Sequence, residues 1–498
     1  MRGTLWVMKG VGTRIACCLA LPCALPVAPC LADNDPEIPG QVIVRVAPGH
    51  SIPEVREWLR TVSVHPTATQ IVPSANVVLF NYELESGQTQ AAVDTLLGEL
   101  ASGGVIVWGE SNRVNETAEG QTGSLWVTGL SDFSIFQSQY AVDSLGLSAA
   151  WQHSGGALVS VAIIDSGIDL SHEAVQGPQA AGGWDFIDLD SNPAEAGDGI
   201  DNDLDGLIDE SVGHGTFVSS IIRLVAPHAR QIHIRAMDDE GRATSFRTAA
   251  AIHYAVDLGA DVINVSLASM DSSDAMADAC ARAKDTGAIV LGAMGNLGSL
   301  GPLHYPASDP NAFGIGASTV LGSRGAFSNY GSHLDLLAPG ATLGWPSGTL
   351  DSATSVIGAA IGGGYAYWQG TSFATAFASG CAALVRAQYP TWPNVTVPQA
   401  DVADQVMGIL SQTARNIDAT EPALAGLLGA GVIDAAAATA LGPNAPRLAD
   451  LNHDGVVNGI DLGEMLVSWG TCNNCLAEIN GDGVVNGADL GLMFSDWD

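Results

Sequence analysis

Positive charge is scarce in this chain. Its 498 residues include 18 Lys and Arg against 53 Asp and Glu, which gives a formal net charge of −35 at pH 7. Nucleic acids and anionic membrane surfaces bind proteins through clustered positive charge, so neither is expected as a partner. The acidic excess serves solubility, cation binding or both.

Long apolar runs are also few. One run extends from Ile15 to Leu31, follows three basic residues and contains three prolines. Small residues at Cys30-Leu31-Ala32 complete the pattern of a secretory signal peptide over residues 1–32. No later segment is long and apolar enough to span a bilayer. We therefore expect a secreted, extracellular or cell-surface protein without a transmembrane anchor after signal removal.

Only four of the eight cysteines lie beyond the signal peptide: Cys280, Cys381, Cys472 and Cys475. In an oxidising compartment Cys472 and Cys475 can form a local disulfide, and the lack of a second close pair argues against zinc. For Cys280 and Cys381 buried free thiols are favoured over a bridge, although both remain open.

Three short motifs carry residues suited to nucleophilic catalysis. Asp165 follows the apolar run Val161–Ile164, and His214 lies within Gly213-His214-Gly215-Thr216. Ser372 lies in a Gly-Thr-Ser turn that leads into an Ala-rich helical pattern. Backbone N–H groups at a helix N-terminus lack intrahelical partners, so they stabilise a developing oxyanion. An isolated turn of this kind usually only caps a helix, so the interpretation depends on all three motifs.

In the order Asp, His, Ser, these motifs resemble those of the subtilisin-like serine protease (subtilase) family. The resemblance covers residues 138–441 and implies hydrolysis of peptide bonds in polypeptides. It implies that Ser372 is the nucleophile, that His214 is the general base and that Asp165 orients His214. Asn296, in Gly295-Asn296-Leu297-Gly298, would complete the oxyanion hole, with a simple turn role as the alternative.

The same region has the pattern of an α/β fold. Apolar strand-like runs alternate with helical patterns over residues 158–388, which predicts a parallel sheet with helices on both faces. Ligands of such sheets bind beyond the carboxyl ends of the strands, where Asp165 is expected. We predict a subtilisin-like domain that is preceded by a small α+β domain and followed by a small α module.

Two segments are candidates for substrate binding. Val265-Ser266-Leu267-Ala268 resembles the strand edge that pairs with an extended peptide in the family, so Ser266, Leu267 and Ala268 are expected to bind substrate. His304 aligns with the segment that floors the S1 pocket, which holds the substrate side chain before the cleaved bond. A His there makes the pocket shallower or more polar, unless one inserted residue turns it away.

Residues 33–120 have a pattern of their own. Strands are expected at 41–46, 70–72, 77–82 and 105–108, with helices at 53–62 and 89–100. This β-α-β-β-α-β order is ferredoxin-like. Between a signal peptide and a subtilase domain it resembles the family's inhibitory propeptide, and an unrelated binding domain is the alternative. Cleavage is expected between Trp108 and Tyr140, in or near a polar connector over Glu116–Ser124.

An acidic insertion lies between Asp165 and His214. Asp201, Asp203, Asp205 and Asp209, with a glycine at the sixth position, match the spacing of a calcium loop. Val212 stands where a bidentate carboxylate is expected, so Glu210 is a possible substitute ligand. We favour Ca²⁺ over a solvated acidic loop.

The C-terminal region, residues 449–498, contains an internal repeat of two acidic, Gly-containing loops. It resembles a type I dockerin, a paired calcium-loop module that docks onto cohesin domains. The resemblance implies the following Ca²⁺ ligands: Asp450, Asn452, Asp454, Val456, Asn458 and Asp461 in the first loop, and Glu478, Asn480, Asp482, Val484, Asn486 and Asp489 in the second. Glu478 departs from the usual Asp. A cohesin-like partner, a surface anchor and a stabilising cap all remain open.

Together these features predict a secreted serine endopeptidase that is matured by cleavage of its own propeptide and carries a calcium-dependent docking tail. Two alternatives remain. One is a catalytically inactive subtilase-like scaffold that binds peptides or surfaces. The other is an enzyme that cleaves only its propeptide and then acts as a binding protein.

Overall fold

The computed structural model describes most of the chain. It covers residues 36–119, 127–130, 132–179, 182–202, 208–301, 303–343, 350–394, 397–442, 449, 451, 457–471, 477, 479, 484–495 and 497. The predicted signal peptide, Cys472 and Cys475 lie outside these residues. Among the residues described, no helix is both long and apolar enough to cross a membrane.

The N-terminal unit, residues 36–119, is an antiparallel sheet with two helices. Its elements are β1 (Glu37–Val46), α1 (Ile52–Leu59), β2 (Ser63–Val72), β3 (Val77–Leu84), α2 (Gln90–Ser102) and β4 (Ile106–Glu116). The strand order is β2-β3-β1-β4. Val42, Val44 and Val46 alternate along β1 and share a core with α1 and α2. The predicted ferredoxin-like element order is present.

The last strand of this unit is longer than expected. β4 ends at Glu116 rather than near Trp108, and it pairs with β9 (Arg242–Thr244) of the following domain. Glu116 also bridges Ala268. The sequence after Trp108 is too polar for an apolar alternation, so the extended conformation comes from partner strands that are distant in sequence. The first residue of the predicted connector, Glu116, therefore lies between Arg242 and Ala268 of the next domain.

A seven-stranded sheet forms the centre of that domain, in the order β13-β12-β11-β10-β6-β8-β7. The strands are β6 (Ser160–Asp165), β7 (Trp184–Asp185), β8 (Arg230–Arg235), β10 (Val262–Val265), β11 (Ile289–Ala293), β12 (Phe313–Ser318) and β13 (Leu336–Pro339). All the pairings between them are parallel. The predicted parallel sheet is confirmed.

Helices cover both faces of the sheet. Val161 and Ile163 pack in a cluster with α6 (His214–Val225) and α9 (Thr371–Ala387). Ala162 and Ile164 face the opposite side, with α7 (Ser245–Asp257) and α8 (Asp274–Asp285). Strands buried on both faces are continuously apolar, as this sequence predicts. Cys280 and Cys381 are buried free thiols in these two different clusters.

Smaller elements complete the central domain. They include a three-stranded sheet in the order β14-β15-β5 and several further helices. These elements are α3 (Phe133–Gln137), α4 (Tyr140–Ser144), α5 (Leu147–Ala150), β5 (Val127–Leu130), β14 (Val356–Ala359), β15 (Tyr365–Trp368), α10 (Val402–Thr413) and α11 (Ala435–Ala440).

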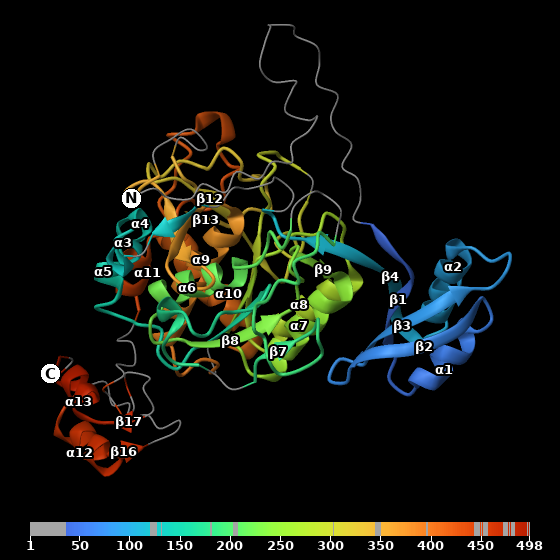
Figure 1. Ribbon diagram of the computed structural model, residues 1–498, viewed down its shortest axis with the longest axis horizontal. Helices are drawn as coiled ribbons and strands as arrows, with labels where there is room; N and C mark the ends of the chain where they lie inside the picture. The colour runs from blue at the N-terminus through green and yellow to red at the C-terminus, as the bar shows by residue number, and fades with distance from the viewer. Residues whose placement is uncertain are drawn as a thin grey trace, which may run out of the picture.

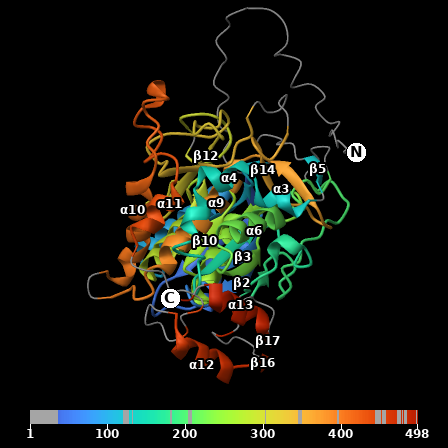
Figure 2. The ribbon, with the colours of Figure 1, turned by 90° about the vertical axis from the view of Figure 1, so that its left-hand side faces the viewer.

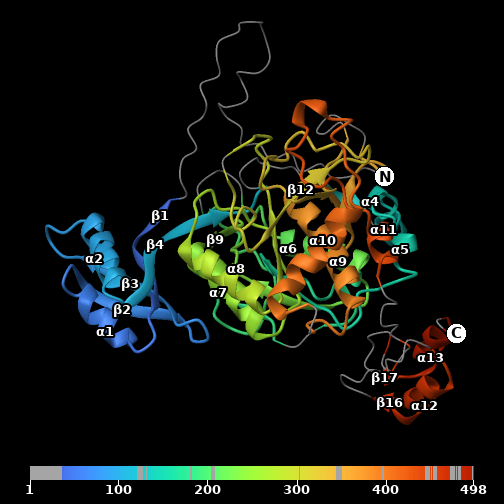
Figure 3. The same cartoon turned by 180° about the vertical axis from the view of Figure 1, so that it is seen from behind.

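The C-terminal module has its own small core. It contains α12 (Gly459–Val467), β16 (Gly470–Thr471), β17 (Val484–Val485) and α13 (Gly487–Ser495), and Val457, Met465, Val485 and Met493 are fully buried. Figure 1 and the view from behind in Figure 3 show this module and the N-terminal unit at opposite ends of the long axis. Figure 2, seen from the C-terminal end, shows α12 and α13 below the central domain.

Candidate active site

Four polar side chains from distant segments meet at the carboxyl-terminal edge of the parallel sheet. Asp165 is the last residue of β6, and His214 is the first residue of α6. Ser372 lies in the first turn of α9, and Asn296 follows β11. Each of the four exposes 4% or less of its surface. The four residues singled out in the sequence are therefore neighbours in a buried site.

Glycines allow this close approach. Gly213, directly before His214, has a φ of +100°. A Cβ built on Gly215 would lie 2.1 Å from the carbonyl oxygen of Gly167, in the loop after Asp165. The Gly-His-Gly sequence thus lets α6 begin in direct contact with that loop.

The imidazole of His214 is held on several sides. Its Nδ1 lies 2.7 Å from Asp165 Oδ1, which also accepts a hydrogen bond from the Ser166 N–H at 2.8 Å. The ring packs against Trp368 and Phe373, with centroid separations of 5.5 and 5.4 Å. These aromatic contacts keep water from the ring and leave Nε2 facing the cleft.

Asn296 is oriented by the turn that carries Ser372. Its Oδ1 accepts hydrogen bonds from Thr371 N (3.0 Å) and Thr371 Oγ1 (2.9 Å). Nδ2 is therefore directed into the site, where it donates to Glu119 Oε1 at 3.1 Å. The backbone N–H of Ser372 donates to the same oxygen at 3.4 Å. Two donors thus converge on one position, as an oxyanion hole requires.

Glu119 occupies the centre of the site. Its Oε2 accepts a hydrogen bond from Ser372 Oγ at 2.5 Å and lies 3.3 Å from His214 Nε2. Its Oε1 is bound by the two converging donors. A Cβ on Gly370 would lie only 1.6 Å from that oxygen, so any other residue at this position would displace the carboxylate. The Glu119 carboxylate stands where the carbonyl of a reacting peptide would lie.

The charge around His214 favours its protonated form. Burial acts to lower the pKa of the imidazole, but the Asp165 carboxylate at Nδ1 and the Glu119 carboxylate at Nε2 raise the pKa to about 10. With Glu119 in place His214 is therefore an imidazolium at neutral pH. An imidazolium cannot accept the proton of Ser372, so Glu119 opposes catalysis through charge as well as through space.

A second glutamate, Glu195, supports the site from behind. Its Oε1 accepts hydrogen bonds from the Gly213 N–H at 2.7 Å and from Ser166 Oγ. Its Oε2 accepts one from Thr216 Oγ1 at 2.6 Å. Glu195 therefore ties the first turn of α6 to the loop after Asp165. Burial and the nearby Asp165 charge raise the pKa of Glu195, whereas the helix N-terminus favours its anion.

The predicted peptide-binding edge borders the site. Ala268 N donates to Glu116 O at 3.0 Å, and Ser266 O lies 3.2 Å from Ser372 Oγ, as a second acceptor for the hydroxyl that donates to Glu119. The Leu267 side chain packs in the core beside α7 and α8, so this residue presents only its backbone. His304 is buried, with Nδ1 3.2 Å from Asn329 Nδ2.

Known proteins with similar sequences identify the family of this chain. Residues 156–431 match the sequence profile of the Subtilase family. The chain belongs to this family. It is 31% identical over 270 residues to thermitase of Thermoactinomyces vulgaris. This alignment covers 54% of this chain and 90% of thermitase. It is 33% identical over 254 residues to subtilisin NAT of Bacillus subtilis subsp. natto, which covers 49% of this chain and 59% of that protein. The protein is thus a serine endopeptidase.

A solved structure extends the likeness of fold. The crystal structure of fervidolysin from Fervidobacterium pennivorans, described as a keratinolytic enzyme related to subtilisin, superimposes with a TM-score of 0.60 at 21% identity. The match covers 84% of this chain and 62% of fervidolysin. It therefore includes more of this subtilase than the sequence alignments do.

The structure describes some of the predicted calcium ligands. Asp209 lies with Asp198 and Asp239, and one oxygen from each carboxylate falls within 4.8 Å of the others. Asp461 and Asp489 are fully buried, and each accepts a backbone N–H at the start of a helix, from Asn458 at 2.9 Å and Asn486 at 2.8 Å. Asp201 and Val484 are described, but Asp201 is not part of the acidic cluster. The predicted ligands that lie outside the described residues are Asp203, Asp205, Asp450, Asn452, Asp454, Val456, Glu478, Asn480 and Asp482.

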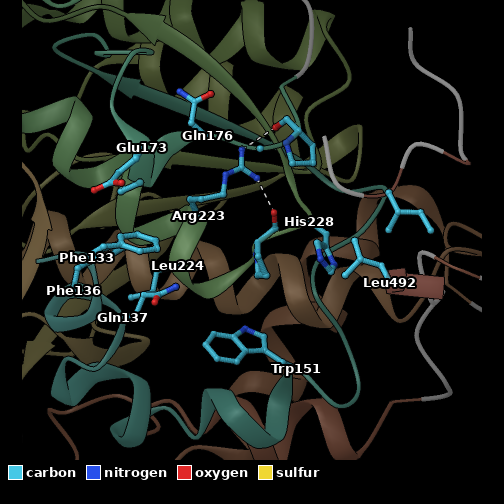
Figure 4. A pocket seen from close by; sticks show the side chains of 15 residues that line it. Phe133, Phe136, Gln137, Trp151, Glu173, Gln176, Arg223, Leu224, His228 and Leu492 are labelled. Atoms are coloured by element: carbon cyan, nitrogen blue, oxygen red, sulfur yellow. Dashed lines mark hydrogen bonds between the residues drawn. The ribbon is translucent and has the colours of Figure 1, made fainter. Parts of the chain in front are cut away.

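A separate pocket lies between the central domain and the C-terminal module (Figure 4). Its lining includes Trp151, Arg223 and His228 from the central domain and Ile479 and Leu492 from the module. The Arg223 guanidinium donates to the carbonyl oxygens of Pro178, Pro227 and Ala229, at 2.7 to 2.9 Å. Arg223 therefore fixes backbone, and none of the four catalytic candidates lines this pocket.

Glu119, Glu195, Asp198 and Asp239 were missed by the sequence analysis. Asp198 begins the acidic insertion but precedes the calcium-loop spacing, Glu195 lies before the insertion without a motif of its own, and Asp239 lies after His214. Glu119 lies in the predicted connector, and its partner Ser372 is 253 positions away. The available signal for Glu119 was a carboxylate within the region where cleavage is predicted.

We expect Glu195→Gln to lower kcat of the mature enzyme about tenfold, the equivalent of one hydrogen bond to a charged group. KM for a peptide substrate should stay nearly constant, because Glu195 positions His214 and does not touch the cleft. Steady-state kinetics of the variant and of Glu173→Gln, an exposed change outside the triad, measure the difference. A raised KM with unchanged kcat would contradict this role.

We also expect Glu119→Gln to lower the pKa of His214 by about 1 to 3, because it removes one neighbouring negative charge. The comparison is made in uncleaved chains that carry Ser372→Ala, by NMR titration of the histidine ring. Glu83→Gln, an exposed change on β3, serves as the control. An unchanged pKa would show that Asp165 alone keeps His214 protonated.

Proposed function

We propose that this subtilase is a secreted endopeptidase in which Ser372 attacks the scissile carbonyl and His214 takes the serine proton. Asp165 holds His214 and stabilises the imidazolium, and Asn296 with the Ser372 N–H binds the oxyanion. His214 Nε2 then protonates the leaving amine, and water hydrolyses the acyl-enzyme by the same steps. The observation that carries this proposal is the single Glu119 carboxylate bound by nucleophile, base and both oxyanion donors.

The N-terminal unit acts as an inhibitory propeptide in this proposal. Its strand β4 continues the substrate path, because Glu116 pairs with Arg242 on one side and bridges Ala268 on the other. Figure 1 shows β4 reaching from the N-terminal unit to β9 of the central domain. The unit therefore enters the cleft as an extended peptide, the form in which proteases bind substrate.

Charged contacts support a specific fit between the unit and the protease. The Glu110 carboxylate accepts hydrogen bonds from Asp274 N at 2.9 Å and Ala275 N at 3.0 Å, at the start of α8. A carboxylate at a helix N-terminus satisfies otherwise unpaired N–H groups. Arg113 pairs with Asp271 at 3.1 Å, and Arg45 pairs with Asp278.

Calcium is the proposed cofactor. Three clustered carboxylates, Asp198, Asp209 and Asp239, are the hard oxygen donors that Ca²⁺ prefers. Burial and the neighbouring Asp239 raise the pKa of Asp209, so a cation between them would relieve their repulsion. The C-terminal repeats would bind further Ca²⁺ and attach the enzyme to a cohesin-like or surface partner. The substrates of the enzyme would be polypeptides and its own propeptide.

Expression of the chain from Asp33 with Ca²⁺ tests the protease proposal. The wild type should lose its N-terminal unit and degrade an unfolded protein, because Ser372 supplies the nucleophile. Ser372→Ala should stay intact and inert, and Ser138→Ala, an exposed serine, should behave as the wild type. Intact mass and substrate hydrolysis are the measurements. A folded wild type that stays whole and inert would favour the binding scaffold instead.

Removal of Ca²⁺ by a chelator should lower the melting temperature by several degrees, because a ligand that binds only the folded state stabilises it. In the inert Ser372→Ala background, Asp239→Asn should reduce this difference. Asp285→Asn, an exposed change at the end of α8, should leave it unchanged. Equal chelator effects in all three chains would exclude the Asp198, Asp209 and Asp239 cluster as a stabilising site.

A further inference from the structure

A small apolar niche lies beside the nucleophile. Ala118 is fully buried and forms a cluster with Ala268 and Ala293, which are also fully buried. Ala268 belongs to the peptide-binding edge, and Ala293 ends β11 directly before the oxyanion-hole segment. Ala118 is also the residue directly before Glu119. The niche is therefore filled by the side chain that precedes the residue bound at Ser372.

Backbone hydrogen bonds of the two preceding residues position Ala118 in this niche. Glu116 O accepts the Ala268 N–H at 3.0 Å, and Thr117 N donates to Gly241 O at 3.0 Å. The segment is thus held on alternate sides by two chain segments, as a substrate strand is. Main-chain bonds set its register, so the side chain of Ala118 enters the niche whatever its own affinity.

The walls of the niche are backed by a rigid segment. A Cβ on Gly295 would lie 2.8 Å from His304 Nε2, and one on Gly292 would lie 2.6 Å from Ala307 N. On the other wall, Ser269 and Tyr305 exchange backbone hydrogen bonds at 2.9 and 2.8 Å. The segment around His304 therefore packs closely against both walls of the niche and limits their outward movement. A side chain larger than alanine would overpack this space.

We propose that this niche is the S1 pocket and that the enzyme cleaves after small apolar residues, beginning with its own Ala118–Glu119 bond. This inference rests on the proposed protease function. It resolves the role of His304, which makes the pocket shallow by supporting the wall at Gly295.

The proposed cleavage needs only Ser372, His214, the Ala118–Glu119 bond and water. The Glu119 carboxylate first leaves the position between Ser372, His214 and Asn296, so that His214 gives up its extra proton to water and the Ala118 carbonyl takes that position. Ser372 Oγ then bonds to the Ala118 carbonyl carbon while its proton passes to His214 Nε2. The carbon–nitrogen bond to Glu119 then breaks, and the departing amine takes that proton. Water, activated by His214, releases Ala118 as a new carboxylate and restores Ser372. Glu119 becomes the N-terminus of the mature enzyme.

Matched peptides that differ only in the residue before the cleaved bond test the specificity. For the mature wild type, kcat/KM should be about 10- to 200-fold higher with Ala than with Leu or Phe, the range for a misfit in an apolar pocket. N-terminal sequencing of the processed enzyme should begin at Glu119. A preference for Leu or Phe would overturn this inference and leave the protease function standing. The absence of any Ser372-dependent hydrolysis would overturn both.

Two variants locate the preference in the niche. Ala268→Gly should enlarge it and reduce the preference for Ala over Leu at least several-fold, whereas Ala353→Gly, in an exposed turn, should not. Ala118→Phe in the precursor should slow self-cleavage by a factor similar to the peptide preference, and this readout does not require a change in the protease domain. Unchanged processing of Ala118→Phe at the same bond would overturn the assignment of the pocket.

Discussion

The rest of the candidate active site depends on the hydrogen bond between Asp165 and His214. This bond, 2.7 Å long, holds the first residue of α6 against the last residue of β6. A sheet edge and a helix start come this close only because Gly215 leaves room for the Gly167 carbonyl. Glu195 then binds both the Ser166 hydroxyl and the Gly213 N–H, so the same contact is held from a third segment. Ser372 and Asn296 are arranged around the imidazole that this contact fixes.

Much of the architecture could be predicted from the sequence because its signals are local. The parallel strands are short, continuously apolar and separated by helices, and the triad residues lie within glycine-containing motifs. The α+β order of the N-terminal unit follows from alternation within single strands. In each case the residues that decide the structure are neighbours in the chain.

The parts that could not be predicted depend on contacts between distant segments. β4 is extended as far as Glu116 because β9 pairs with it, and the sequence of β4 gives no sign of that partner. Glu195 has partners at positions 166, 213 and 216, and Glu119 has partners at 214, 296 and 372. A glutamate in a polar segment looks like solvated surface until the fold closes around it. The calcium assignments in the C-terminal repeats stay predictions, because most of their residues lie outside the described part of the chain.

The N-terminal unit and the C-terminal module lie at opposite ends of the long axis, with the protease between them (Figure 1). Departure of one end therefore requires no movement of the other. Under the proposed function, a precursor attached through its C-terminal module would be activated at its attachment point, and the released N-terminal unit would diffuse away from it. Inhibition and attachment would then be controlled separately, so the inactive precursor could bind to a surface before its activity begins there.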